Sequence, residues 1–74
     1  MQRLEWKLDL DGSINAHDAD WVYEIIWQPQ HKMWQLCVEP ATARGPDWRK
    51  WHLTAYLQDA MAIAQAIAAG VQID

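Results

Sequence analysis

The chain has 74 residues, with six tryptophans, one cysteine and a formal net charge of −4. A chain this short forms one small domain over residues 1–74, with little room for a deep pocket plus a catalytic apparatus. The lone Cys37 excludes an internal disulfide framework and predicts a cytoplasmic location, and the negative charge disfavours broad nucleic-acid binding. No run approaches the roughly 18 apolar residues of a membrane span, so we expect no membrane association.

The first strand is predicted over residues 3–11, where polar and apolar residues alternate without a fault. The apolar residues expected on its buried face are Leu4, Trp6, Leu8 and Leu10. Asp11 and Gly12 then indicate a turn. The polar stretch 13–20 follows, with room for a short continuation of pairing around Ile14 and Ala16.

Two further strands are predicted over residues 21–28 and 32–39, each ended by a proline, Pro29 and Pro40. The short connection makes them antiparallel neighbours. Their alternation places one set of side chains toward a helix: Trp21, Tyr23, Ile25, Trp27, Trp34, Leu36 and Val38.

The C-terminal part of the chain predicts a helix, with Thr54 as the expected N-cap and Gly70 as its stop. Residues recur there at helical spacing: Leu57, Ala60, Met61, Ala64, Ile67, Ala68 and Val71. Apolar and polar residues also alternate over residues 48–53, which is compatible with a fourth, short edge strand. The fold class is therefore α+β, an antiparallel sheet of three or four strands packed against one C-terminal helix in a two-layer sandwich.

The segment from Asp9 to Asp18 resembles the calcium loop of a dockerin repeat, with Asp9, Asp11, Gly12, Ile14, Asn15 and Asp18 in register. The first ligand position, however, is Lys7, and the chain holds one copy flanked by predicted strands. We therefore expect a solvated hairpin turn and no metal site.

The residues for catalysis are sparse. Ser13 is the only serine, Cys37 the only thiol, and the three histidines are scattered along the chain. The sequence contains neither a phosphate-binding glycine loop nor a dinucleotide motif. We expect a protein that is not an enzyme and has no catalytic residue and no cofactor.

The segment 44–52 concentrates basic and aromatic side chains, among them Arg44, Trp48, Arg49 and Lys50. Aromatic side chains can stack on nucleobases while the basic side chains between them contact phosphates. Nucleic-acid binding along the edge 48–52 is therefore the alternative function. The interpretation we favour is that Trp51 and Leu53 pack into the core, while Arg49 and Lys50 are ordinary edge-strand charges that prevent the sheets of two molecules from pairing edge to edge.

The other predicted site is the face of the sheet turned away from the helix. Alternation places four apolar residues there, Val22, Ile26, Met33 and Cys37. Polar residues flank them, and an apolar patch with a polar rim is typical of an interface with a protein partner or with a second copy of the chain.

Residues across most of the chain carry a loose resemblance: Trp6, Asp11-Gly12-Ser13, Ala16, Tyr23-Glu-Ile25, Trp34-Gln-Leu36, Leu57-Gln-Asp-Ala60 and Ala64. The pattern is similar to small uncharacterised βββα proteins of phages, prophages and mobile gene cassettes. The resemblance implies an accessory gene product that works by binding, and no site residues come with it. We expect a protein-interaction module that forms a homodimer or binds a host or defence protein with a basic groove.

Overall fold

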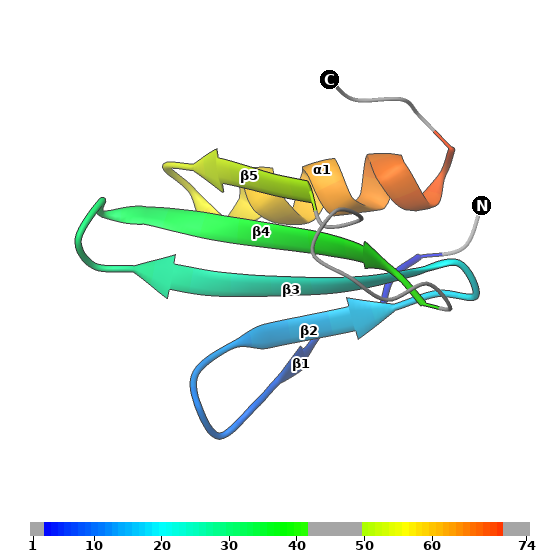
Figure 1. The fold of residues 1–74 in the computed structure, drawn as a ribbon, viewed down its shortest axis with the longest axis horizontal. Helices are drawn as coiled ribbons and strands as arrows, with labels where there is room; N and C mark the ends of the chain where they lie inside the picture. Colours follow the sequence, from blue (N-terminus) through cyan, green and yellow to red (C-terminus); the bar gives the residue numbers. More distant parts are fainter. Residues whose placement is uncertain (1–2, 42–49, 71–74) are drawn as a thin grey trace.

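The computed structural model describes residues 3–41 and 50–70, with Lys50 described by its backbone alone. Within these ranges the chain forms five strands and one helix (Figure 1). The elements are β1 (Lys7–Leu8), β2 (Ile14–His17), β3 (Trp21–Gln28), β4 (Met33–Pro40), β5 (Lys50–Thr54) and α1 (Leu57–Ala68). The predicted fold class, α+β with a C-terminal helix on an antiparallel sheet, is confirmed.

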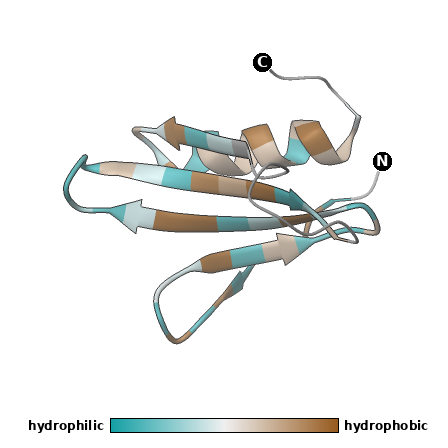
Figure 2. Cartoon of the chain, viewed as in Figure 1, coloured by the Kyte–Doolittle hydropathy of each residue, from teal (hydrophilic) through white to brown (hydrophobic). Residues whose placement is uncertain are grey.

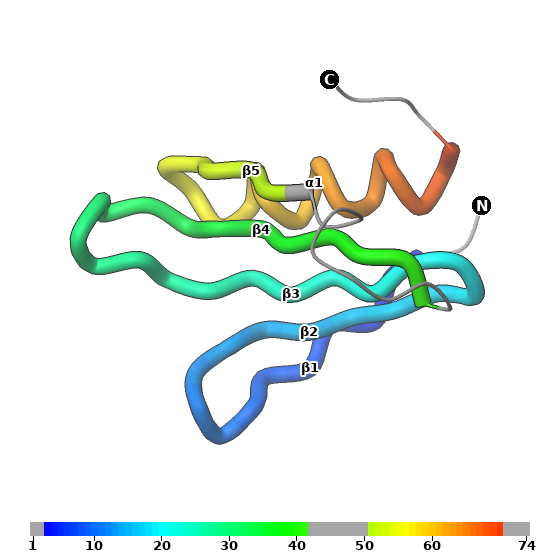
Figure 3. The backbone as a smooth tube through the Cα atoms, in the orientation of Figure 1, coloured from blue at the N-terminus to red at the C-terminus, as the bar shows by residue number. Residues whose placement is uncertain are grey.

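The strands follow one another across the sheet in chain order, and every neighbouring pair is antiparallel. The longest ladder joins β3 to β4, from Trp21 opposite Pro40 to Gln28 opposite Met33. The β1–β2 turn, the β3–β4 turn and the β5–α1 connection all lie at one end of the sheet (Figure 3). Because neighbouring strands pair residue by residue, side chains at alternate positions form rows across the strands on each of the two faces.

The sheet has five strands rather than three or four. The polar stretch after Gly12 contains β2, whose Ala16 is buried opposite Tyr23. Of the strand predicted over 3–11, only β1 pairs. Leu8 and Leu10 were expected to be buried but are 75% and 109% exposed. The physical reason is the width of the covering layer, because α1 packs on β3, β4 and β5.

The helix begins at Leu57, later than predicted, and its N-cap is Tyr56 rather than Thr54. The Thr54 hydroxyl donates a hydrogen bond to the backbone carbonyl of Tyr56 at 2.9 Å, so it closes the turn between β5 and α1. Gly70 follows the helix with a φ of +86°, as expected for a glycine that ends a helix. Val71 lies outside the described residues.

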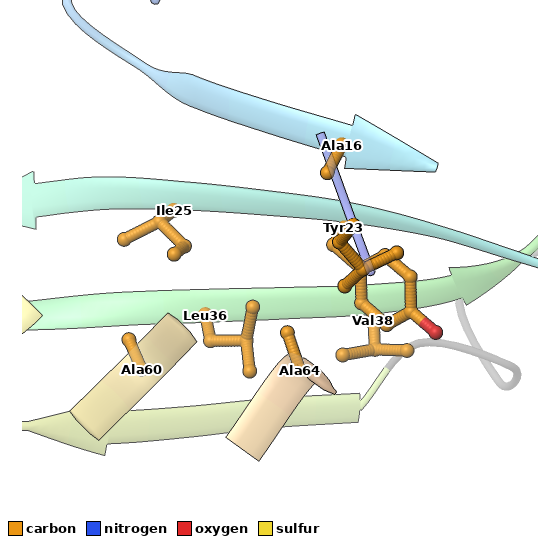
Figure 4. Close-up of a cluster of buried hydrophobic side chains, with 8 residues drawn as sticks. Ala16, Tyr23, Ile25, Leu36, Val38, Ala60 and Ala64 are labelled. Atoms are coloured by element: carbon orange, nitrogen blue, oxygen red, sulfur yellow. The ribbon is translucent and has the colours of Figure 1, made fainter. Parts of the chain in front are cut away.

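The core lies between α1 and the facing side of the central strands (Figure 4). The largest fully buried side chains are Tyr23, Ile25, Leu36 and Val38. Ala60 and Ala64 of α1 point toward them, and both are 0% exposed. Two alanines one helical turn apart allow the helix to approach the sheet closely. Figure 2 shows that hydrophobic segments occur along the strands and along α1.

Trp21, Trp27 and Trp34, which were expected to face the helix, lie around this core rather than at its centre. Trp21 and Trp34 pack against the core and are partly buried. Trp27 lies beyond the cover of α1, is 42% exposed and contacts Trp34 with ring centroids 5.1 Å apart. The centre of the core is occupied by one tyrosine and three aliphatic residues packed against the two alanines.

Candidate functional site

The side of the sheet that faces away from α1 carries apolar side chains on three adjacent strands. Residues two apart along a strand share a face, so the buried positions of β3 and β4 place their sequence neighbours on the opposite side. We call this surface the outer patch; its members are Val22, Ile26, Met33, Cys37, Trp51 and Leu53. The four residues predicted to form an interface therefore do share the outer face of adjacent strands.

Trp51 and Leu53 belong to the outer patch, which contradicts the favoured interpretation that they pack into the core. Each is 52% exposed. The β4–β5 register pairs Leu36 with His52, so His52 takes the helix-facing position between them. The hydrophobicity of Trp51 and Leu53 predicts the wrong face for them. Which face they take is decided by the pairing of β5 with β4, which local sequence does not reveal.

The register also arranges the outer side chains in rows. Trp51 lies opposite Cys37, Cys37 lies opposite Glu24, and Glu24 lies opposite Asn15. One row along, Leu53 lies opposite Gln35, which pairs with Ile26. Apolar side chains from three strands therefore lie close together, and sequence reasoning had placed Glu24 only at their rim.

A groove of about 300 Å³ crosses this surface. Its lining residues are Asn15, Val22, Glu24, Ile26, Cys37, Glu39 and Trp51. It combines an aromatic side chain, aliphatic side chains and two carboxylates. At one side of the patch the amide of Gln28 donates a hydrogen bond to the side-chain carbonyl of Gln35, which adds to a polar rim.

The residues predicted for nucleic-acid contact are not placed by the structure. Arg44, Trp48 and Arg49 lie outside the described residues, and only the backbone of Lys50 is described. Beside this segment, His52 has a buried Nε2 atom for which the described part of the chain offers no hydrogen-bond partner.

The segment that resembles a calcium loop forms a tight hairpin turn. Gly12 has a φ of +90°, and Asp11 Oδ1 accepts hydrogen bonds from the backbone nitrogen and hydroxyl of Ser13 at 2.9 and 2.6 Å. These bonds lower the pKa of Asp11 below its usual value. Asn15 donates to Asp9 at 2.6 Å, while Asp18 belongs to the next turn. Within residues 3–41 and 50–70, no group of three His, Cys, Asp or Glu side chains is arranged to hold a metal ion.

A larger cleft, of about 480 Å³, lies between the N-terminal segment and the edge of the sheet. Sequence reasoning did not find it, because its lining comes from separate parts of the chain. Charges of both signs line it, with Arg3 and Lys7 beside Glu5, Asp9 and Asp18. Such a mixed lining selects no class of ligand by charge.

Comparison with known proteins gives no relative from which a function can be transferred. No protein-family model matches the chain, and neither a curated protein nor a solved structure matches it. In the part of the chain that the structure describes, no helix has the length and apolar character needed to cross a membrane.

Proposed function

We propose that this protein is a non-enzymatic interaction module that binds a protein partner through the outer patch. The observation that carries the proposal is the half exposure of Trp51 and Leu53 beside the four apolar residues of β3 and β4. Isolated apolar residues on a surface are ordinary, but six of them gathered on three adjacent strands, with polar residues among and around them, are typical of a binding surface. Tryptophan is among the residues that contribute most to protein interfaces.

The charges on this face favour a different protein over a second copy as the partner. Glu24 and Glu39 both line the groove within the patch, and the chain carries a net charge of −4. Two copies stacked on these faces would bring the Glu24 carboxylates of both into one interface, and like charges brought together cost several kcal/mol. A partner with apolar anchors and basic neighbours complements the same surface. In keeping with the resemblance to accessory proteins of mobile elements, we take this partner to be a protein of the host cell.

The proposal can be tested by selecting binding peptides from a random peptide display library on the wild-type protein. We expect enriched peptides that bind at least about tenfold more weakly to Trp51→Ser, since a central tryptophan contributes strongly to such a contact. Trp27→Ser is the matched control, because Trp27 is similarly exposed but lies on the helix side of the sheet. It should leave the affinity unchanged.

Three outcomes would overturn the proposal. The first is that no peptide is enriched, or that the enriched peptides bind Trp51→Ser as well as wild type. The second is a dimer in light scattering at high micromolar concentration that Ile26→Lys disrupts, because the occupant would then be a second copy. The third is a salt-sensitive gel shift with single- or double-stranded DNA at micromolar protein, which would favour the nucleic-acid alternative.

A further inference from the structure

One row of the outer face has the parts of a receptor for a cation. Trp51, Cys37, Glu24 and Asn15 lie opposite one another on four successive strands. Neighbouring strands are about 4.8 Å apart, so Trp51 and Glu24 are separated by roughly 10 Å at the backbone. The small side chain of Cys37 lies between them, and all four residues line the groove.

The Glu24 carboxylate is the least satisfied group of this row. Glu24 is half-buried, and its neighbours on the same face of β3 are the aliphatic Val22 and Ile26. Among the residues that the structure describes, none donates a hydrogen bond to the Glu24 carboxylate or forms an ion pair with it. Asn15 and Cys37 lie opposite Glu24 on the two neighbouring strands, and a half-buried carboxylate beside apolar groups gains from a donor or a cation that reaches it. Glu39 lies diagonally across the β3–β4 pair and adds a second negative charge to the groove.

The size of the groove limits what it can accept. Its volume of about 300 Å³ lies at the lower limit of small-molecule sites, so it suits one inserted side chain rather than a larger ligand. The Glu24 carboxylate repels an acidic group. An aromatic face attracts a cation, and a carboxylate pairs best with the planar fork of a guanidinium. An arginine can satisfy both while its aliphatic stem lies along Val22 and Ile26. A lysine ammonium is a strongly hydrated point charge and matches this arrangement less well.

From this arrangement we infer that the groove between Trp51 and Glu24 receives an arginine side chain of the protein partner. The guanidinium stacks on the indole of Trp51 and pairs with the carboxylate of Glu24. The inference rests on the proposed function, because it specifies how a partner bound to the outer patch is recognised.

The test uses the peptides selected on the wild-type protein. Each arginine is replaced in turn by citrulline, which has nearly the same shape but no charge, and the Kd is measured on wild type and on Glu24→Gln. We expect one citrulline substitution to weaken binding to wild type by about 10- to 100-fold. The same substitution should have little effect on Glu24→Gln. Glu5→Gln is the control, since Glu5 is exposed and does not line the groove.

A second measurement needs no variant. Nα-acetyl-arginine-N-methylamide, titrated into the wild-type protein at millimolar concentration, should shift the NMR signals of the Trp51 indole and the Glu24 amide. The citrulline analogue should shift neither. Peptides that depend on Trp51 but bind equally well with citrulline would overturn the arginine inference and leave the proposed function standing. Peptides that bind without regard to Trp51 would overturn both.

Discussion

The hydroxyl of Tyr23 donates a hydrogen bond to Oδ2 of Asp18 at 3.1 Å, although the tyrosine side chain is otherwise wholly buried. The other oxygen of Asp18 accepts from the backbone nitrogens of Asp20 and Trp21 at 2.8 and 2.7 Å. One carboxylate therefore joins the β2–β3 turn to the centre of the core. The pKa of the Tyr23 hydroxyl is raised far above its ordinary value, chiefly by burial and further by the neighbouring Asp18.

This raised pKa predicts a loss of stability in alkali. The folded protein keeps a proton on Tyr23 that the unfolded chain releases above about pH 10. The stabilisation of the folded state by the protonated Tyr23 hydroxyl is therefore complete below that pH and is lost as the pH rises beyond it. Tyr23→Phe should cost about 1 kcal/mol near neutrality, and the gap to wild type should shrink above pH 10. Urea unfolding from pH 7 to 11 measures the effect.

Tyr56→Phe is the control for this experiment, because Tyr56 is 65% exposed. It should change stability by less than about 0.5 kcal/mol across the whole pH range. A gap between Tyr23→Phe and wild type that stays constant up to pH 11 would contradict the assigned role of Tyr23.

The close approach of α1 to the sheet predicts opposite results for two alanines on the same helix. Ala60 is fully buried against the core, whereas Ala62 is exposed. Ala60→Leu should overfill the space above the sheet and destabilise the protein by about 1–3 kcal/mol. Ala62→Leu should be neutral within about 0.5 kcal/mol. Equal urea midpoints for the two variants would contradict the close packing of α1 against the sheet at Ala60.

A hydrogen bond joins the N-terminal segment to the helix: the backbone nitrogen of Leu4 donates to Oε1 of Gln65 at 3.0 Å. Gln65→Ala should cost about 1 kcal/mol and speed hydrogen exchange at the Leu4 amide. Gln65→Glu keeps an acceptor and should protect that amide better than alanine does. Gln58→Ala removes an exposed glutamine from the same helix and should leave the Leu4 amide protected. Unchanged exchange in Gln65→Ala would contradict this assignment.

The sequence predicts the faces of β3 and β4 correctly, because each strand alternates over eight residues. The outer positions of Val22, Ile26, Met33 and Cys37 follow from that pattern alone. The face of β5 does not follow, since Trp51 and Leu53 are more apolar than His52 and local hydrophobicity turns them inward. Only the pairing of β5 with β4 reveals the correct face, and pairing is not a local property.

The limits of the other predictions have equally local causes. Alternation shows that Leu8 and Leu10 share a face with Leu4, but it carries no information about how far a helix extends over that face. Thr54 has the right chemistry for an N-cap, yet its hydroxyl serves the preceding turn. Glu24 reads as a rim residue in the sequence, and only the row from Trp51 to Asn15 places it inside a groove.

The position of α1 after all five strands has a consequence for biosynthesis. A ribosome delivers every strand before the helix that covers them, so the nascent sheet exposes Tyr23, Ile25, Leu36 and Val38 as well as the outer patch. Partly folded sheets with exposed apolar surface are prone to aggregate. The delivery of Ala60 and Ala64 then lets α1 cover one face of this sheet, while the outer patch on the other face stays exposed.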